Sequence, residues 1–178
     1  SNKYVLLLEK QKGVEKPTPY ALLSEYHDKK MVNELKQKVA AGFLPTYLFE
    51  DNQILVEQTE RKDGRVRDKQ DVQAVIGSIV WGGGDPSKSK INELAKHGYR
   101  LALMNDRIAI MDKDGETATP VTYAWLHTIT RKNWKLLPRK RKDFDEKLAS
   151  LQASGASYKV IYDNSLGDTH LIFEQRAP

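Results

Sequence analysis

Cysteine is absent from this sequence of 178 residues, which excludes disulfides, thiolate metal sites and cysteine nucleophiles. Histidine is scarce, and the histidines lack the H-x-x-x-H or H-E-x-x-H spacing of zinc enzymes. No apolar run approaches the roughly 18 residues that a membrane-spanning helix needs. We therefore expect neither a bound metal nor a cofactor.

The signatures of common enzymes are missing as well. The sequence has no G-x-S-x-G elbow, no H-x-E motif with paired cysteines and no kinase signature. Carboxylates are plentiful, but none forms a recognisable acid/base pair. His127 stands next but one to Trp125 in an apolar stretch, which is typical of a structural histidine. We predict a protein that is not an enzyme, with a carboxylate-based hydrolase as a distant alternative.

Composition fits an ordinary folded protein, with 39% hydrophobic and 30% charged residues. The first two residues, Ser1-Asn2, resemble the remnant of a cleaved tag, and no initiator methionine or signal peptide is seen. The sequence is therefore expected to begin inside a longer protein, past a signal peptide or membrane anchor. Together with the absence of cysteine, this favours a periplasmic or exported protein of the bacterial cell envelope.

One pattern occurs three times along the chain. An amphipathic stretch ends in glycine and is followed by an alternating strand, an Asp/Asn turn and a second apolar strand. The three copies span residues 32–60, 91–116 and 144–176. Their helix-ending glycines are Gly42, Gly98 and Gly155, which lie 56 and 57 residues apart. This constant step indicates a true internal repeat, with each glycine in the left-handed conformation that ends a helix.

Each amphipathic stretch is predicted to be a helix with one apolar stripe. The stripes consist of Val32, Leu35 and Val39, of Ile91, Leu94 and Ala95, and of Phe144, Leu148 and Leu151. The residues expected to cap the helix starts are Asp28, Ser87 and Asp143. An apolar strand precedes each helix, at 18–26, 72–81 and 121–129. The stretches 18–26 and 119–128 share a Thr-Pro and a Tyr-Ala-x-Leu.

These elements predict an α+β fold with three strand-helix-strand-strand repeats, an antiparallel sheet and helices packed on one face. Residues 1–17 form a leading segment, whose stretch 3–13 resembles the last strand of an earlier unit. The predicted repeat units are 18–64, 65–117 and 118–178, joined into one compact body.

The glycine-rich stretch 79–94 resembles a phosphate-binding loop only in part. Ser87 replaces the second glycine of the G-x-x-x-x-G-K-[ST] pattern, Pro86 has no N–H to donate, and Asp85 would repel an anion. The repeat instead predicts a strand-to-helix connection with Pro86 in the first turn and Lys88 exposed. A weak anion site at this helix start is the alternative.

The third unit contains a basic insert, RKNWKLLPRKRK (131–142), that the other two lack. Its candidate binding residues are Arg131, Lys132, Trp134, Lys135, Arg139, Lys140, Arg141 and Lys142. Seven of these are basic, and the formal net charge of the whole chain is +5, so the remaining residues together carry −2. Cations at a helix start oppose the helix dipole, and Trp134 offers a stacking face. The insert is either a solvated loop or a surface for a partner, which would be an anionic polymer, a membrane surface or a protein.

The half-unit 35–57 resembles the helix–glycine–strand–strand half of SPOR domains, and equally several short bacterial strand–helix–strand–strand domains. The likeness to SPOR domains implies peptidoglycan as a partner, although 35–57 includes no diagnostic binding residue. We expect a non-catalytic binding or scaffold module that contacts partners through sheet edges and the basic loop. A nucleic-acid-binding protein that uses 131–142 is the alternative.

Overall fold

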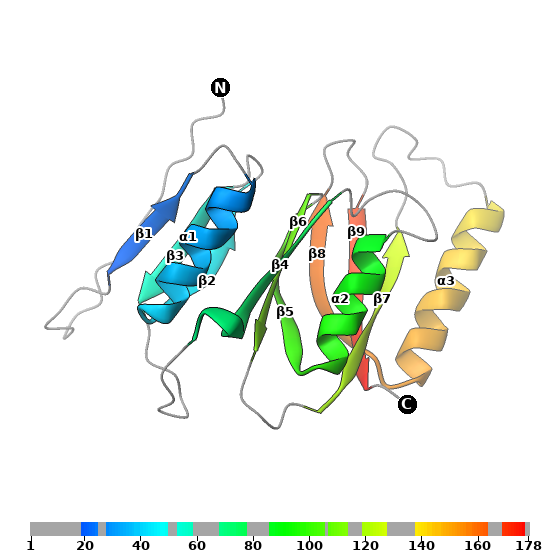
Figure 1. Ribbon diagram of the computed structural model, residues 1–178. Coiled ribbons are helices and arrows are strands. Elements are labelled where there is room, and N and C mark those ends of the chain that lie inside the picture. Colours follow the sequence, from blue (N-terminus) through cyan, green and yellow to red (C-terminus); the bar gives the residue numbers. More distant parts are fainter. Residues whose placement is uncertain are drawn as a thin grey trace, which may run out of the picture.

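The computed structural model describes residues 19–24, 28–49, 53–58, 68–77, 86–105, 107–113, 119–127, 138–163 and 169–176. Within these residues the order strand, α-helix, strand, strand occurs three times. The three units follow one another in a row, from blue at the N-terminal end to red at the C-terminal end (Figure 1).

The first unit consists of β1 (Tyr20–Leu23), α1 (Asp28–Ala40), β2 (Phe43–Leu48) and β3 (Ile54–Gln58). The second consists of a short 3-10 helix η1 (Lys69–Asp71), β4 (Val72–Ile76), α2 (Pro86–Lys96), β5 (Tyr99–Met104) and β6 (Ile108–Lys113). The third consists of β7 (Val121–His127), α3 (Pro138–Ala153), β8 (Ser157–Asp163) and β9 (Thr169–Arg176).

Each unit forms its own three-stranded antiparallel sheet. The strand orders are β1-β3-β2, β4-β6-β5 and β7-β9-β8, so the last strand of each unit lies in the centre. We call these sheets A, B and C. The α+β fold with strand-helix-strand-strand repeats is thus confirmed, with three small sheets in place of a single one.

The repeat extends to backbone detail. The helix-ending glycines Gly42, Gly98 and Gly155 have φ of 88°, 88° and 72°, as the sequence predicts. A β-bulge adds one residue to the strand that follows the helix in every unit, namely β2, β5 and β8. The bulges lie between Pro45 and Tyr47, Leu101 and Leu103, and Tyr158 and Val160. The extra residues Thr46, Ala102 and Lys159 keep the spacing of the glycines, so the three units share one strand register.

The helix starts and stripes differ partly from the prediction. Helix α3 begins at Pro138, so Asp143 lies inside the helix and does not cap its start. The reason is that proline suits the first helical turn and Arg and Lys are good helix formers. The buried stripe of α1 is Met31, Leu35 and Val39, and Val32 is only half-buried.

Strand β4 is shorter than predicted. It ends at Ile76 because Gly77 has a φ of 152°, a backbone conformation that residues other than glycine rarely adopt. Trp81, predicted within this strand, lies outside the described residues.

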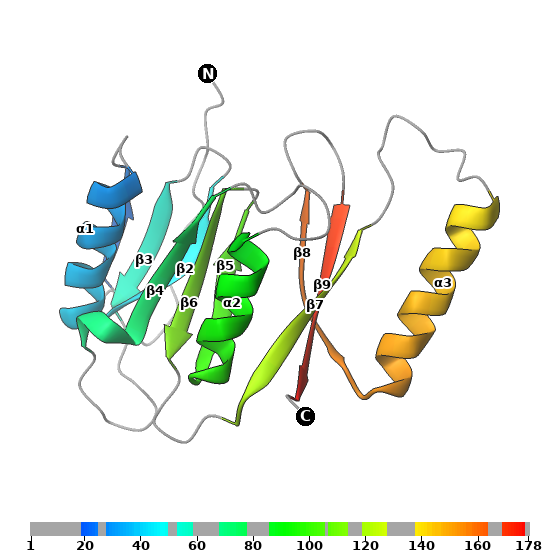
Figure 2. The same ribbon diagram turned by 45° about the vertical axis from the view of Figure 1, so that its right-hand side comes forward.

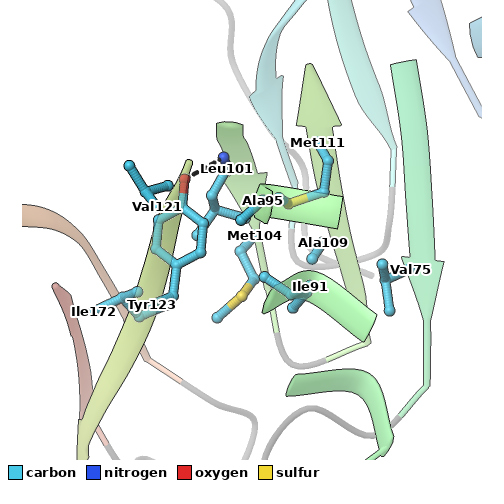
Figure 3. Packing of buried hydrophobic residues seen from close by; sticks show 10 residues of the cluster. All are labelled: Val75, Ile91, Ala95, Leu101, Met104, Ala109, Met111, Val121, Tyr123 and Ile172. Carbon is cyan, nitrogen blue, oxygen red and sulfur yellow. Dashed lines mark hydrogen bonds between the residues drawn. The ribbon is translucent and has the colours of Figure 1, made fainter. Parts of the chain in front are cut away.

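Two apolar clusters connect neighbouring units. The first joins α1 and sheet A of unit 1 to sheet B of unit 2, and consists of Leu23, Met31, Leu35, Val39, Ile54, Val56, Val72, Ile108 and Ile110. The second, drawn in Figure 3, joins α2 and sheet B to sheet C, and consists of Val75, Ile91, Ala95, Leu101, Met104, Ala109, Met111, Val121, Tyr123 and Ile172. Helices α1 and α2 therefore pack against their own sheet and against the next one.

Helix α3 stands at the end of the row in both views (Figures 1 and 2). Between Lys142 and Ala153, where its side chains are described, it has no buried residue. Its predicted stripe of Phe144, Leu148 and Leu151 is half-buried, whereas Leu35 of α1 and Ile91 of α2 are at most 1% exposed. The difference follows from position, because no further sheet lies against α3 in the part of the chain described.

Candidate binding surfaces

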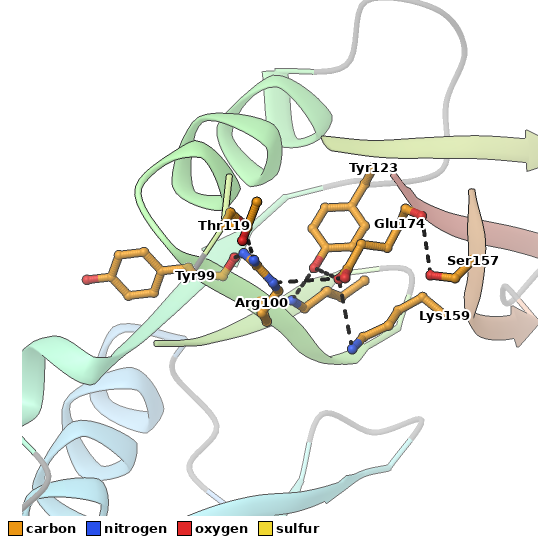
Figure 4. Close-up of polar contacts among 8 residues, drawn as sticks. Tyr99, Arg100, Thr119, Tyr123, Ser157, Lys159 and Glu174 are labelled. Atoms are coloured by element: carbon orange, nitrogen blue, oxygen red, sulfur yellow. Dashed lines mark hydrogen bonds and ion pairs between the residues drawn. The ribbon is translucent and has the colours of Figure 1, made fainter. Parts of the chain in front are cut away.

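The polar groups best organised in the described structure lie where units 2 and 3 meet (Figure 4). The hydroxyl of Tyr123 donates to Glu174 Oε2 at 2.9 Å and accepts from the backbone N–H of Leu101 at 2.8 Å. Arg100 Nε lies 3.9 Å from Glu174 Oε1, and Lys159 Nζ lies 4.0 Å from Glu174 Oε2. Arg100 also donates to the carbonyl oxygen of Thr119.

Burial dominates the electrostatics of Tyr123. It raises the pKa of the hydroxyl well above its ordinary value, and the nearby Glu174 carboxylate raises it further. The hydrogen bond from Leu101 and the charge of Arg100 act in the opposite direction but do not prevail. Tyr123 therefore stays protonated at neutral pH, and its hydroxyl forms a hydrogen bond that connects sheet C to Leu101 of sheet B.

A second polar contact holds α2 to the same sheet. Asn92 on α2 accepts from the backbone N–H of Tyr123 at 2.6 Å and donates to its carbonyl oxygen at 3.2 Å. Strand β7 lies at the edge of sheet C, so Asn92 satisfies backbone groups that no strand pairs. This is one way of covering a sheet edge with a helix.

The basic insert is described only in part. Residues 131–137, including Arg131, Lys132, Trp134 and Lys135, lie outside the described residues. Arg139, Lys140, Arg141 and Lys142 belong to the start of α3, whose first turn contains no acidic residue. The side chain of Lys142 is 76% exposed and lies 3.6 Å from Glu146 on the next turn.

The glycine-rich stretch is also partly outside the described residues, from 78 to 85. Helix α2 begins at Pro86, as the strand-to-helix interpretation predicts. Lys88 is not fully exposed, contrary to the prediction. Its Nζ lies 5.8 Å from the ring centroid of Trp125 on β7, because the next unit covers this side of α2.

Histidines and carboxylates do not gather into a metal site in the described part of the chain, where no group of three could hold an ion. His127 and His170 face each other in the β7–β9 register, but their side chains lie outside the described set. None of the described helices is long and apolar enough to cross a membrane.

Exposed apolar side chains form the surface that sequence reasoning missed. Among the described residues, the large ones are Tyr20, Leu22, Tyr47, Ile76 and Tyr158. All five lie on edge strands, namely β1 and β2 of sheet A, β4 of sheet B and β8 of sheet C. The Tyr-Ala-x-Leu motif shared by strands β1 and β7 was the available signal, because it places Tyr20 where Tyr123 lies in the third unit.

Searches with the chain find no matching family model, no matching curated protein and no matching solved structure. The resemblance to SPOR domains therefore depends on the residue pattern of 35–57 alone.

Proposed function

We propose that this chain is a non-catalytic binding or scaffold module of a bacterial protein, of the cell envelope, that contacts partners through its sheet edges. The observation that carries the proposal is that the exposed large apolar side chains of the described residues all stand on edge strands. An edge strand presents unpaired N–H and C=O groups, and a partner strand or helix can cover them.

Two features strengthen this proposal. Tyr47 is 55% exposed and Tyr158 is similarly open, and tyrosine is among the residues enriched in protein interfaces. The polar network around Tyr123 acts between units, so the chain already uses sheet surfaces and edges for recognition within itself. A partner outside the chain would use the same chemistry.

Site-specific photo-crosslinking in the organism that encodes the protein tests the proposal. A photoreactive residue at Tyr47 is expected to trap a discrete adduct, and the same residue at the exposed Lys90 on α2 serves as the control. Adducts that are absent at Tyr47, or identical at both positions, would contradict binding through sheet edges.

An anionic partner is the second candidate, and the start of α3 favours it. Four basic residues occupy its beginning, Lys142 is largely exposed, and the N-terminal end of a helix attracts negative charge. The partner would be nucleic acid, peptidoglycan or an anionic membrane surface. Arg131, Lys132, Trp134 and Lys135, which precede the helix in sequence, would extend the contact.

A further inference from the structure

Each sheet has an outer surface, which is the face turned away from the helix of its own unit. The environment of this outer surface differs among the three units. In sheet B this outer surface includes Val72 and Ile110, which pack on α1, and in sheet C it includes Tyr123 and Ile172, which pack on α2. In sheet A this outer surface carries no helix of the described residues. It bears Tyr20 and Leu22 on β1, Leu55 and Glu57 on β3, and Leu44 and Tyr47 on β2.

Sheets A and C correspond residue by residue on this surface. Tyr20 pairs with Glu57 in register and donates to its carboxylate at 3.2 Å, as Tyr123 does with Glu174 at 2.9 Å. Two residues further, Leu22 occupies the position of Trp125. Yet Tyr20 is 44% exposed and Tyr123 only 3%, because α2 packs on the outer surface of sheet C and none of the described helices packs on that of sheet A.

The complementary half of this contact lies at the other end of the chain. Leu35, Ile91 and Leu148 each precede their helix-ending glycine by seven residues, so they occupy the same helical position. Leu35 and Ile91 are buried between two sheets, and Leu148 is half-buried with one sheet beside it. At this position α3 therefore carries an apolar side chain, as α1 and α2 do where they lie between two sheets.

We propose that a second copy of this chain docks head to tail, with α3 of one copy on the outer surface of sheet A of the next. Phe144 and Leu148 would then cover Tyr20 and Leu22, continuing the interface that the chain forms internally at α1 and at α2. The two surfaces differ, so the contact is heterologous and extends into a row or closes into a ring. This inference rests on the proposed binding function and names its partner.

Each of two charge substitutions blocks one of the two surfaces of the proposed head-to-tail contact. Leu22→Asp places a carboxylate on sheet A and leaves α3 intact, and Leu148→Asp does the reverse. Ser24→Asp and Ser150→Asp are matched controls, because both serines are exposed, close to the substituted positions and receive the same charge. Circular dichroism checks that every variant is folded.

Analytical ultracentrifugation of the purified chain should show self-association at protein concentrations up to ~1 mM, the weak end of specific binding. We expect each blocking variant to be monomeric, both controls to associate like the wild type, and an equimolar mixture of the two blocking variants to form a one-to-one dimer that grows no further. This recovery follows because each variant retains the end that the other lacks.

A wild-type chain that is monomeric throughout this range, or a mixture of the variants that stays monomeric, would overturn the inference. Association that survives Leu22→Asp would also overturn it, because the contact would then lie elsewhere. The two proposals can fail separately. A monomeric chain that still yields a specific adduct at Tyr47 in cells would retain the proposed binding function, but its partner would be another protein and not a second copy.

Discussion

Tyr123 and Glu174 face each other across strands β7 and β9, and the tyrosine hydroxyl donates to the carboxylate at 2.9 Å. The same pair, Tyr20 and Glu57, stands at the same register in the first unit. Tyr123 is buried beneath a helix, whereas Tyr20 faces solvent. The two pairs therefore allow the cost of burying this contact to be measured within a single protein.

Replacing Tyr123 by Phe should lower the free energy of unfolding by about 1–3 kcal/mol. The loss arises because the buried N–H of Leu101 loses its acceptor and Glu174 loses a donor. Tyr20→Phe is the matched control and should change stability little, since water can replace its exposed hydroxyl. Urea denaturation measures the free energy of unfolding of both variants. Equal losses would show that the Tyr123 hydroxyl does not stabilise the contact between units.

Alkaline pH should weaken the fold through Tyr123. Its pKa is raised in the folded protein above the ordinary value of 10.0, so above pH 10 the unfolded chain loses a proton that the folded chain keeps. This contribution is complete below pH 10 and falls by up to about 1.4 kcal/mol per pH unit above it. Denaturation of wild type and Tyr123→Phe between pH 8 and about 11 should show a steeper decline in the wild type. Parallel declines would contradict the raised pKa.

Alanine at Gly42 or Gly155 should cost about 1–2 kcal/mol of stability, because both residues have positive φ. An added Cβ would meet no atom within 4 Å at either position, so the cost comes from the backbone alone. Asparagine tolerates this conformation better and should cost less at both positions. Thermal denaturation compares the variants, and an asparagine that costs more than alanine would refute this explanation.

Lys88→Ala should cost about 0.5–1 kcal/mol, the value of a cation–π contact at a partly exposed site. The reason is the position of Lys88 Nζ over the ring of Trp125 in the next unit. Lys90→Ala is the control, since its i,i+3 pair with Glu93 is exposed and worth less than about 0.5 kcal/mol.

ATP and GTP should bind no better than inorganic phosphate in calorimetry. Mg²⁺-dependent hydrolysis that is lost in Lys88→Ala would indicate a nucleotide site after all.

Replacing Arg139, Lys140, Arg141 and Lys142 with serine should abolish binding to anionic polymers and preserve the fold. The wild type should lose affinity steeply as salt rises, because binding releases counterions. Trp134→Ala should weaken single-stranded nucleic acid by about 1–3 kcal/mol and leave a charged membrane or glycan almost unaffected. Oligonucleotides, anionic vesicles and peptidoglycan fragments are titrated at low and near-physiological salt. No binding to any of them at low salt would identify the insert as a solvated loop.

The sequence predicted the repeat because its strongest signals are local. Gly42, Gly98 and Gly155 report a backbone requirement that each unit meets independently of its neighbours. The start of α3 was predicted too late, since a run of cations looks like a loop although Arg and Lys are good helix formers.

Contacts between units could not be predicted from local sequence patterns. Nothing adjacent to Lys88 in sequence indicates the ring of Trp125, and a tyrosine in an apolar strand looks alike whether its surface is open or covered. Only the stacking order distinguishes Tyr20 from Tyr123. For the same reason the open surface of sheet A, the candidate site, emerged from comparison of the three sheets and not from any motif.

The bulge at Thr46 determines which way an aromatic ring points. Side chains of a strand alternate between its two faces, and one extra residue reverses the alternation beyond it. Tyr47 therefore shares a face with Leu55 and Leu22, whereas an unbulged strand would turn this tyrosine toward α1. Deletion of Thr46 would instead remove the bulge and place Tyr47 directly after Pro45. The tyrosine would still pair with Leu55, so its ring would keep the solvent-facing side.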